Sequence, residues 1–199
     1  DRAAHVFFPN SSYMKRSHTR RDMSLLRNSS YTIVPHEELT EADTNRICEL
    51  YQKLFVEKHS KFNPVYTQKY FRQAIQEGWH HYTALRSPEG KIDAFISWFY
   101  SEGIMICGPL GYDTAIDRKV GLYRQLVALC LKHANENRVI FNMGGGSDEF
   151  KSKRGSTETL EYTAVYCKHL PFYRQVPWRL LSWACNKLLK KVLNSTSRL

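Results

Sequence analysis

The residue types with the clearest chemical potential lie together in one segment of the sequence. It begins with three consecutive glycines: Gly144, Gly145 and Gly146. A glycine backbone has no Cβ and adopts positive φ readily, so a ligand can approach its N–H groups closely. Lys151, Lys153 and Arg154 then place three cations within four residues. The pattern predicts a site for phosphate or another anion; the alternative is a flexible turn with solvated lysines.

Carboxylates, histidines and a thiol near this segment are candidates for proton transfer or nucleophilic attack. Glu149 and Asp148 lie on the loop itself, where a carboxylate can accept a proton from an ammonium group. Either can instead cap a short helix, which is the favoured interpretation for Asp148. Further candidates for a general base are Asp113, His81, Glu161 and His169. Cys167 and His169 would share one face of a strand and could form a thiol–imidazole pair, but no third member or oxyanion-binding feature accompanies them.

Hydrophobic periodicity predicts the elements that must position these residues. Apolar residues at helical spacing predict helices over 17–26, 40–59, 65–77, 117–135 and 177–193. Apolar or alternating runs predict strands over 31–34, 80–85, 92–100, 104–110, 139–143 and 160–167. Two helices, three antiparallel strands, a long helix and two more strands follow one another in this order. We therefore expect an α+β fold with a mixed, mainly antiparallel sheet flanked by helices.

Several short motifs resemble the Fem-like branch of the GNAT acyltransferase superfamily. They are the triple glycine, Phe150-Lys151, Arg154-Gly155-Ser156, Ala164-Val-Tyr166 and His169-Leu-Pro171. Upstream, the basic run 15–23 is similar to the helix that opens this domain, and Gly111-Tyr-Asp113 to the turn before its long helix. The resemblance covers about residues 13–178. It implies a GNAT-like fold, and because Fem-like proteins usually carry two such domains in tandem, this chain resembles the second.

The resemblance also implies an activity, N-acyl transfer by direct attack of an amine on an activated acyl group. Lys151 corresponds to a lysine beside the reacting carbonyl or a donor phosphate, and Arg154 is suited to hold a phosphate or carboxylate. Glu149 completes the candidate catalytic set. The glycines 144–146, with Arg118 and Gly121, are the candidate residues for binding the donor.

The donor is expected to be acyl-CoA or a similar activated compound, and the acceptor an amine of a small molecule, sugar or peptide. Most GNAT domains bind the donor with a loop of the form Gln/Arg-x-x-Gly-x-Gly/Ala. Here Arg118 and Gly121 fit that pattern, whereas Tyr123 stands where the second small residue is expected. This departure leaves two alternatives open. One is an aminoacyl group carried by tRNA, as in some Fem-like enzymes, and the other is a non-catalytic domain that needs a partner half.

Composition and charge bound these hypotheses. The chain has 199 residues, 42% of them hydrophobic and 24% charged, which is ordinary for one globular domain. Its net charge of +10 is concentrated at both ends. Residues 1–28 hold six Lys or Arg against two acids, and residues 168–199 hold seven and no acid. The basic ends could contact tRNA, an anionic membrane or a phosphorylated substrate, or serve only solubility.

Cysteine usage and segment boundaries complete the expectations. The five cysteines are widely spaced and lack metal-ligand spacing, so we expect free thiols, no metal site and a cytoplasmic location. No apolar run approaches the roughly 20 residues of a transmembrane helix. We expect a basic N-terminal segment (1–30), a remnant of a preceding GNAT-like domain or a linker helix, then an acyltransferase domain (31–176). A basic amphipathic helix (177–199) follows, which docks onto the sheet or lies on a membrane surface.

Overall fold

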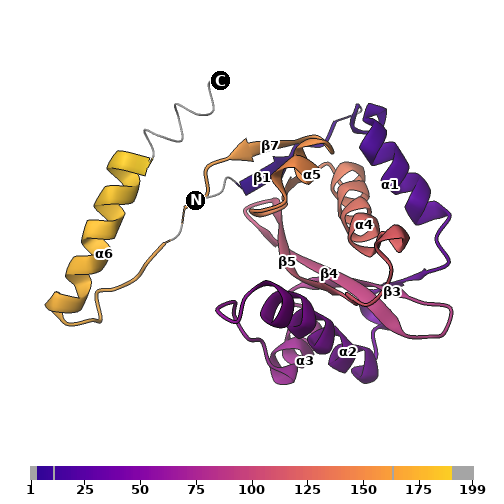
Figure 1. The fold of residues 1–199 in the computed structure, drawn as a ribbon, viewed down its shortest axis with the longest axis horizontal. Coiled ribbons are helices and arrows are strands. Elements are labelled where there is room, and N and C mark those ends of the chain that lie inside the picture. The colour runs from indigo at the N-terminus through magenta and orange to yellow at the C-terminus, as the bar shows by residue number, and fades with distance from the viewer. Residues whose placement is uncertain (1–3, 11, 163, 190–199) are drawn as a thin grey trace. The chain divides into compact units, whose positions relative to one another are not determined.

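The computed structural model describes residues 4–10, 12–162 and 164–189. The chain divides into two compact units, Asp1–Leu160 and Glu161–Leu199. The first unit contains a single sheet with helices on both of its faces (Figure 1). The second unit contains one long helix.

The sheet of the first unit has the strand order β2-β3-β4-β5-β6-β1-β7. Its strands are β1 (Ala4–Phe7), β2 (Thr32–Pro35), β3 (His81–Arg86), β4 (Ile92–Ser101), β5 (Ile104–Tyr112), β6 (Ile140–Asn142) and β7 (Ser156–Thr159). Neighbouring strands are antiparallel except for β5 and β6, which are parallel. The sheet is therefore mixed and mainly antiparallel, as the sequence predicted.

The main helices of this unit are α1 (Ser17–Arg27), α2 (Glu41–Tyr51), α3 (Gln68–Gln76), α4 (Leu122–Glu136) and α5 (Asp148–Ser152). Shorter helical segments are η1 (Tyr13–Lys15), η2 (His36–Glu38), η4 (Arg118–Val120) and the π-helical η3 (Gln52–His59), which continues α2. Thr40 begins α2 because its hydroxyl accepts a hydrogen bond from the Asp43 N–H, while Asp43 reaches back to the Thr40 N–H. Helix α4 connects the parallel strands β5 and β6.

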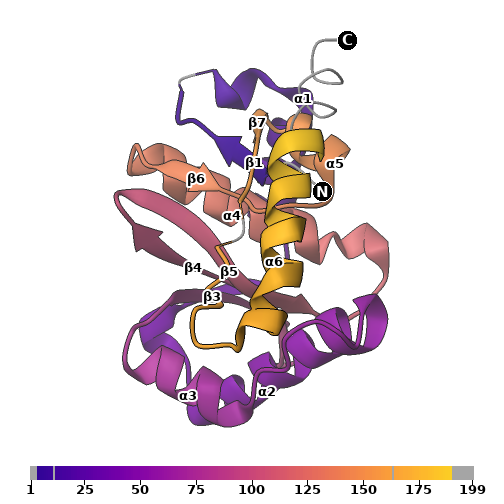
Figure 2. The same ribbon diagram turned by 90° about the vertical axis from the view of Figure 1, so that its left-hand side faces the viewer.

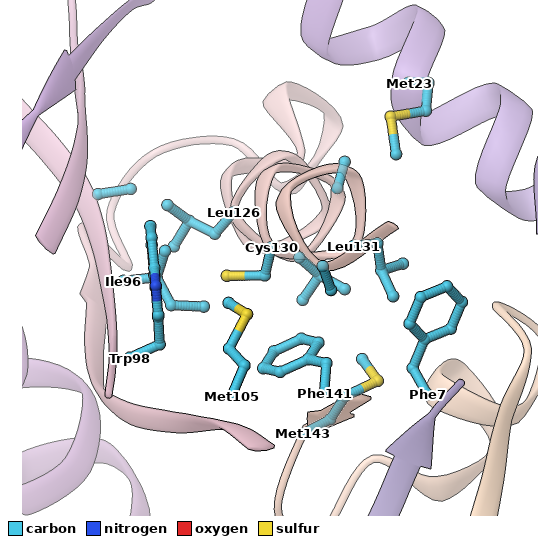
Figure 3. Packing of buried hydrophobic residues seen from close by; sticks show 14 of the residues in the cluster. Phe7, Met23, Ile96, Trp98, Met105, Leu126, Cys130, Leu131, Phe141 and Met143 are labelled. Atoms are coloured by element: carbon cyan, nitrogen blue, oxygen red, sulfur yellow. The ribbon is translucent and has the colours of Figure 1, made fainter. Parts of the chain in front are cut away.

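Two hydrophobic clusters fix the helices to opposite faces of the sheet (Figures 1 and 2). On one face, Leu126 and Leu131 of α4 pack among side chains of β4, β5, β6 and β1, as Figure 3 shows. On the other face, α2 and α3 pack on β2, β3 and β4. Helix α2 also approaches β5 so closely that a Cβ on Gly111 would lie 2.7 Å from the Leu50 carbonyl carbon. Glycine at this position therefore allows the helix and the strand to meet.

The sequence predicted most of these elements but missed one strand and misplaced another. Strand β1 was not expected, although it pairs with β6 on one side and β7 on the other. The strand expected over 160–167 is wrong, since the described residues there form no strand and β7 lies just before them. Pairing with β1 selects the polar residues 156–159 for the sheet, and no local hydrophobic pattern marks them.

Three helix starts also differ from expectation. Helix α3 begins at Gln68, not at 65, because the Thr67 hydroxyl caps it by accepting a hydrogen bond from the Tyr70 N–H. Helix α4 begins at Leu122, not near 117, because Gly121 adopts a left-handed conformation (φ 68°) and separates it from η4. In the second unit, α6 (Phe172–Ala184) begins before Pro177, which lies inside the helix. Its first turn forms at Pro171, whose carbonyl accepts hydrogen bonds from the N–H groups of Arg174 and Gln175.

The π-helical segment η5 (Cys185–Leu189) continues α6, and the end of the expected helix, 190–193, lies outside the described residues. None of the helices in the described part of the chain is both long and apolar enough to cross a bilayer.

Candidate functional site

The glycine loop that follows β6 is closed around a buried lysine. The Lys151 Nζ donates hydrogen bonds of 2.9 Å to each of three carbonyl oxygens, those of Met143, Gly144 and Gly145. These bonds match the three N–H donors of an ammonium group, and the Lys151 residue is only 4% exposed. Gly144 and Gly146 adopt positive φ, which lets the carbonyls converge. The loop thus directs carbonyl oxygens, not N–H groups, towards its predicted catalytic cation.

Strand β1 holds this loop in place. The His5 N–H donates to the Gly144 carbonyl, and the Met143 N–H donates to the His5 carbonyl, at 3.0 and 2.8 Å. The buried His5 ring contacts Ser156 Oγ through Nδ1 (3.0 Å) and Asp148 Oδ1 through Nε2 (3.3 Å). Sequence reasoning missed His5 because its partners lie more than a hundred residues away. The residue ties the loop, α5 and β7 to one strand.

The two loop carboxylates have different environments. Asp148 is the first residue of α5 and pairs with His5, whereas the N-cap is Ser147, so the expected cap at Asp148 is wrong by one residue. Glu149 is exposed, and a hydrogen bond from Lys153 lowers the pKa of its carboxyl. A lowered pKa makes Glu149 a weak proton acceptor at neutral pH.

Arg154 is the second buried cation of this region, and its contacts are also internal. Its Nε donates to Asp22 Oδ2 (2.6 Å) and its Nη1 to the Phe150 carbonyl (2.7 Å). The guanidinium carbon lies 3.3 Å from the centroid of the Phe150 ring. Asp22 accepts a further hydrogen bond of 2.7 Å from Arg124 Nε. Asp22 therefore clamps α1 to α4 and to the segment that follows α5.

A pocket of about 250 Å³ lies at the carboxyl end of β5, beside the start of α4. It brings together two cations, Lys58 and Arg118, and two aromatic rings, Tyr112 and Tyr123. Among the described residues, neither cation forms an ion pair. Of the predicted donor-binding residues, Arg118 lines this pocket. Gly121 does not line it and is instead the left-handed N-cap of α4.

The carboxylates of the pocket are already engaged by protein groups. Burial alone would raise the pKa of Asp113, but hydrogen bonds from the Ala115 N–H and Arg46, with the Arg46 charge, hold it below its usual range. The Arg46 Nη2 lies 2.6 Å from Asp113 Oδ2. Asp117 accepts a hydrogen bond of 2.8 Å from the Lys119 N–H at the start of η4. Arg46 offsets the charge of Asp113, and the two cations Lys58 and Arg118 outnumber the remaining carboxylate, Asp117. The lining is therefore weakly positive, which suits an anionic ligand.

Strand β5 leads from this pocket towards the middle of the sheet and has an open edge. It pairs with β6 only over 104–106, so within the described residues the remainder of that edge has no ladder partner. On its other side, a bulge places Gly108 and Pro109 opposite Ser97 of β4, and Ser97 Oγ donates to the Pro109 carbonyl (2.7 Å). Ligands of open sheets bind outside the carboxyl ends of such diverging parallel strands.

The pocket and the glycine loop are neighbours. The Tyr123 ring, in the wall of the pocket, lies 5.0 Å from the Phe150 ring of α5. Burial raises the pKa of Tyr123 to about 12, so its phenol stays protonated. Burial likewise raises the pKa of Cys107, at the start of the open edge, to about 11. A thiol of this kind carries little thiolate at neutral pH and is therefore a weak nucleophile.

The remaining candidates do not converge on this site. His81 stacks on Trp98, with ring centroids 6.1 Å apart. Cys167 and His169 belong to the second unit with Glu161, and the strand that would have aligned the first two is absent, so that argument for a dyad fails. His169 instead stacks on Tyr166. No group of three or more His, Cys, Asp or Glu residues in the described part of the chain is arranged to hold a metal ion.

Comparison with known proteins identifies the fold. No protein-family profile and no curated protein sequence matches the chain significantly. Among solved structures, FemX superposes with a TM-score of 0.60 at 10% identity, over 78% of this chain and 59% of FemX. L-PGS from Bacillus licheniformis superposes with a TM-score of 0.56 at 17% identity, over 77% of this chain and 56% of the L-PGS chain. A conserved protein of unknown function from Bacteroides thetaiotaomicron superposes with a TM-score of 0.53 at 16% identity, over 77% of this chain and 54% of that protein.

This chain therefore spans a little over half the length of these structures. The order of its elements, the mixed sheet and these superpositions agree with one another. The chain has the α+β fold of a Fem-like GNAT domain.

Proposed function

We propose that the first unit is an N-acyltransferase that takes its acyl group from acyl-CoA. The acceptor would be an amine of a small molecule, sugar or peptide. The observation that supports this most strongly is the positively charged pocket at the carboxyl end of β5. Its cations, Lys58 and Arg118, suit the phosphates of a nucleotide-bearing donor, and the N-terminus of the 15-residue helix α4 lies beside them.

The open edge of β5 supports the path of the acyl arm. Gly108 lies four residues before Tyr112 of the pocket, a strand length of roughly 13 Å. A donor anchored by its phosphates in the pocket could extend along this edge and hydrogen-bond to its free backbone groups. Its carbonyl would then lie near the bulge at Gly108. There an amine attacks the carbonyl carbon, the oxyanion forms, and the thiol leaves as the amide is made.

A thermal-shift titration tests the donor directly. Acetyl-CoA, longer acyl-CoAs and CoA are titrated into wild type, Arg118→Ala and Lys58→Ala, with Lys119→Ala as the matched control. Ligands that bind the native state raise the melting temperature in a saturable way. We expect that rise in wild type and Lys119→Ala, and a weaker one in the two pocket variants. No rise with any CoA compound would contradict an acyl-CoA donor.

A charged tRNA is the second candidate donor, and the outer face of α1 supports it. The exposed cations there and in the turn before it are Lys15, Arg16, Arg20, Arg21 and Arg27. The one acid of this helix, Asp22, is buried and already paired with two arginines. If tRNA binds this face, its affinity falls steeply with salt, and Arg20→Ala with Arg21→Ala lowers both the affinity and the salt slope. Unchanged binding in that double variant would exclude α1 as the contact.

A third possibility is a domain that works only with a partner half. It is favoured by the fact that the chain spans little more than half of the solved structures that it matches. A preceding GNAT-like domain in the same protein would be such a half. Donor binding without turnover, restored by adding that domain, would support this alternative.

A further inference from the structure

A histidine that the sequence did not single out lies close to the bulge of β5. His80 connects α3 to β3, and its Nε2 lies 3.3 Å from the Tyr70 hydroxyl oxygen. Its Nδ1 is buried and has no hydrogen-bond partner among the described residues. Nearly all buried polar atoms in proteins are paired, so an unpaired imidazole nitrogen needs an explanation. A nitrogen that exchanges a proton with a ligand provides one.

The unpaired nitrogen faces the backbone of the bulge. A Cβ added to Gly108 would lie 2.7 Å from His80 Nδ1 and 2.7 Å from Ser97 Oγ. The absence of a side chain at residue 108 is therefore what allows β5 to pass beside the imidazole. Because β-bulges often re-aim groups next to active sites, the position is suited to chemistry at the open edge of this strand.

On its other side, His80 adjoins aromatic side chains that reach the surface. The rings of Tyr66 and Tyr70 stack with centroids 4.4 Å apart, and Trp79 lies 6.2 Å from Tyr70 and is 51% exposed. Aromatic faces attract ammonium ions. The imidazole thus lies between a surface suited to an amine and the strand along which the acyl donor is proposed to extend.

We propose that His80 is the general base of the acyl transfer, accepting a proton from the acceptor ammonium at Nδ1. This inference depends on the proposed function. In the step, the ammonium gives one proton to neutral His80 and becomes a free amine. Its lone pair forms the new C–N bond, the C–S bond breaks, and the second nitrogen proton goes to the departing sulfur. His80 then releases its proton to solvent.

The environment of His80 suits this role. Burial lowers its pKa, so the ring is neutral and able to accept a proton at physiological pH. The titratable groups that face the ring are Tyr70 of α3, which hydrogen-bonds to Nε2, and Tyr82 of β3, whose ring centroid is 6.1 Å away. When Nε2 donates to the Tyr70 oxygen, the lone pair is on Nδ1, which is the tautomer that the proposal requires.

The tautomer of His80 gives a test that needs no substrate. In the 15N-labelled full chain, the ring nitrogen shifts of His80, assigned by comparison with His80→Gln, report which nitrogen carries the proton near neutral pH. We expect the proton on Nε2 and the lone pair on Nδ1. A proton on Nδ1 would overturn the proposal, because no base would then face the bulge.

Turnover of acetyl-CoA with glycinamide, glucosamine and a lysine-containing peptide gives the second test. We expect His80→Gln to lower the rate roughly 10²- to 10⁴-fold and to remove the rise of rate with pH, while the thermal shift by acetyl-CoA is retained. The matched control is His81→Gln, whose ring lies on the other face of β3 against Trp98 and should leave the rate unchanged.

The two failures are distinguishable. Equal rates in His80→Gln and wild type would overturn the role of His80 and leave the acyltransferase proposal standing. Absence of both a thermal shift and turnover in wild type would reject the proposed donor, and the tautomer would then decide alone whether His80 presents a base. Gly108→Ala adds a check, since its Cβ would block Nδ1 and should lower the rate as His80→Gln does.

Discussion

The glycine loop after β6 and the pocket at the start of α4 have the same ingredients and use them in opposite ways. Both combine glycine at positive φ with nearby cations. In the loop, Lys151 and Arg154 are each 4% exposed and bind carbonyl and carboxylate oxygens of the protein itself. In the pocket, Lys58 and Arg118 are exposed and line an open space. A cation beside a glycine turn therefore indicates a ligand site only where the protein has not already supplied its acceptors.

The largest expected effect on stability is that of replacing Lys151 in the glycine loop. Lys151→Met should lower the free energy of unfolding by on the order of 3–5 kcal/mol, because three carbonyl oxygens lose a charged donor in a buried setting. Denaturant unfolding measures this. Lys153→Met is the matched control: Lys153 forms an exposed pair with Glu149, which is worth at most about 1 kcal/mol. Equal stability of the two variants would contradict a structural Lys151.

A smaller but still large effect on stability is expected at Asp22, the buried carboxylate that binds Arg154. Asp22→Asn should lower stability by about 2–4 kcal/mol, because the buried carboxylate holds two arginines. Thermal unfolding compares it with Asp117→Asn, an exposed cap whose loss should amount to no more than about 1 kcal/mol. If the two losses were similar, the clamp would not be what holds α1 to α4.

The pocket makes a pH-dependent contribution through Asp113. Its pKa in the folded protein is below the usual value near 3.8, so the unfolded chain takes up this proton at higher pH. The stabilisation is complete above the unfolded pKa and is lost as pH falls through the depressed folded pKa, below roughly pH 4. In Asp113→Asn and in Arg46→Met, the free energy of unfolding should fall less steeply as the pH is lowered. Denaturant unfolding at several pH values measures this. Unchanged slopes would refute the pairing.

The smallest effect on stability is expected at the open cation of the pocket. Arg118→Ala should change the free energy of unfolding by less than about 0.5 kcal/mol, because the side chain is exposed. Its acyl-CoA affinity should nevertheless fall, by roughly tenfold if one charged hydrogen bond to phosphate is lost. Calorimetric titration measures the affinity. A stable Arg118→Ala variant with weaker acyl-CoA binding would show that the pocket cation serves binding, in contrast to the loop, where substitution mainly changes stability.

Local pattern was enough to predict the elements that bury a periodic apolar face. The helical period of Ile47, Leu50 and Leu54 predicted the helix that the structure forms there, and the alternation of residues 92–100 predicted β4. The resemblance to Fem-like domains added their order. These predictions succeeded because each depends on residues a few positions apart.

What the sequence missed depends on distant partners. Strand β1 has only four residues, and its partners in β6 and β7 are far along the chain. The same is true of the glycine loop. The sequence drew attention to Lys151, but the burial of its side chain follows from how the loop folds back over it. His80 was overlooked because the environment of its Nδ1 depends on contacts with Gly108 and Tyr70. No sequence pattern links these residues to His80.

The position of β1 also has a consequence for the order of folding. These residues leave the ribosome before the other strands of the sheet, yet the strands on both sides of them, β6 and β7, are made more than a hundred residues later. Because contacts between distant segments form slowly, the hairpins of β3, β4 and β5 should form first and β1 should join last. Until then the glycine loop lacks the backbone partner that His5 provides, so a chain paused during synthesis near residue 140 would hold a formed hairpin core and an unfinished site.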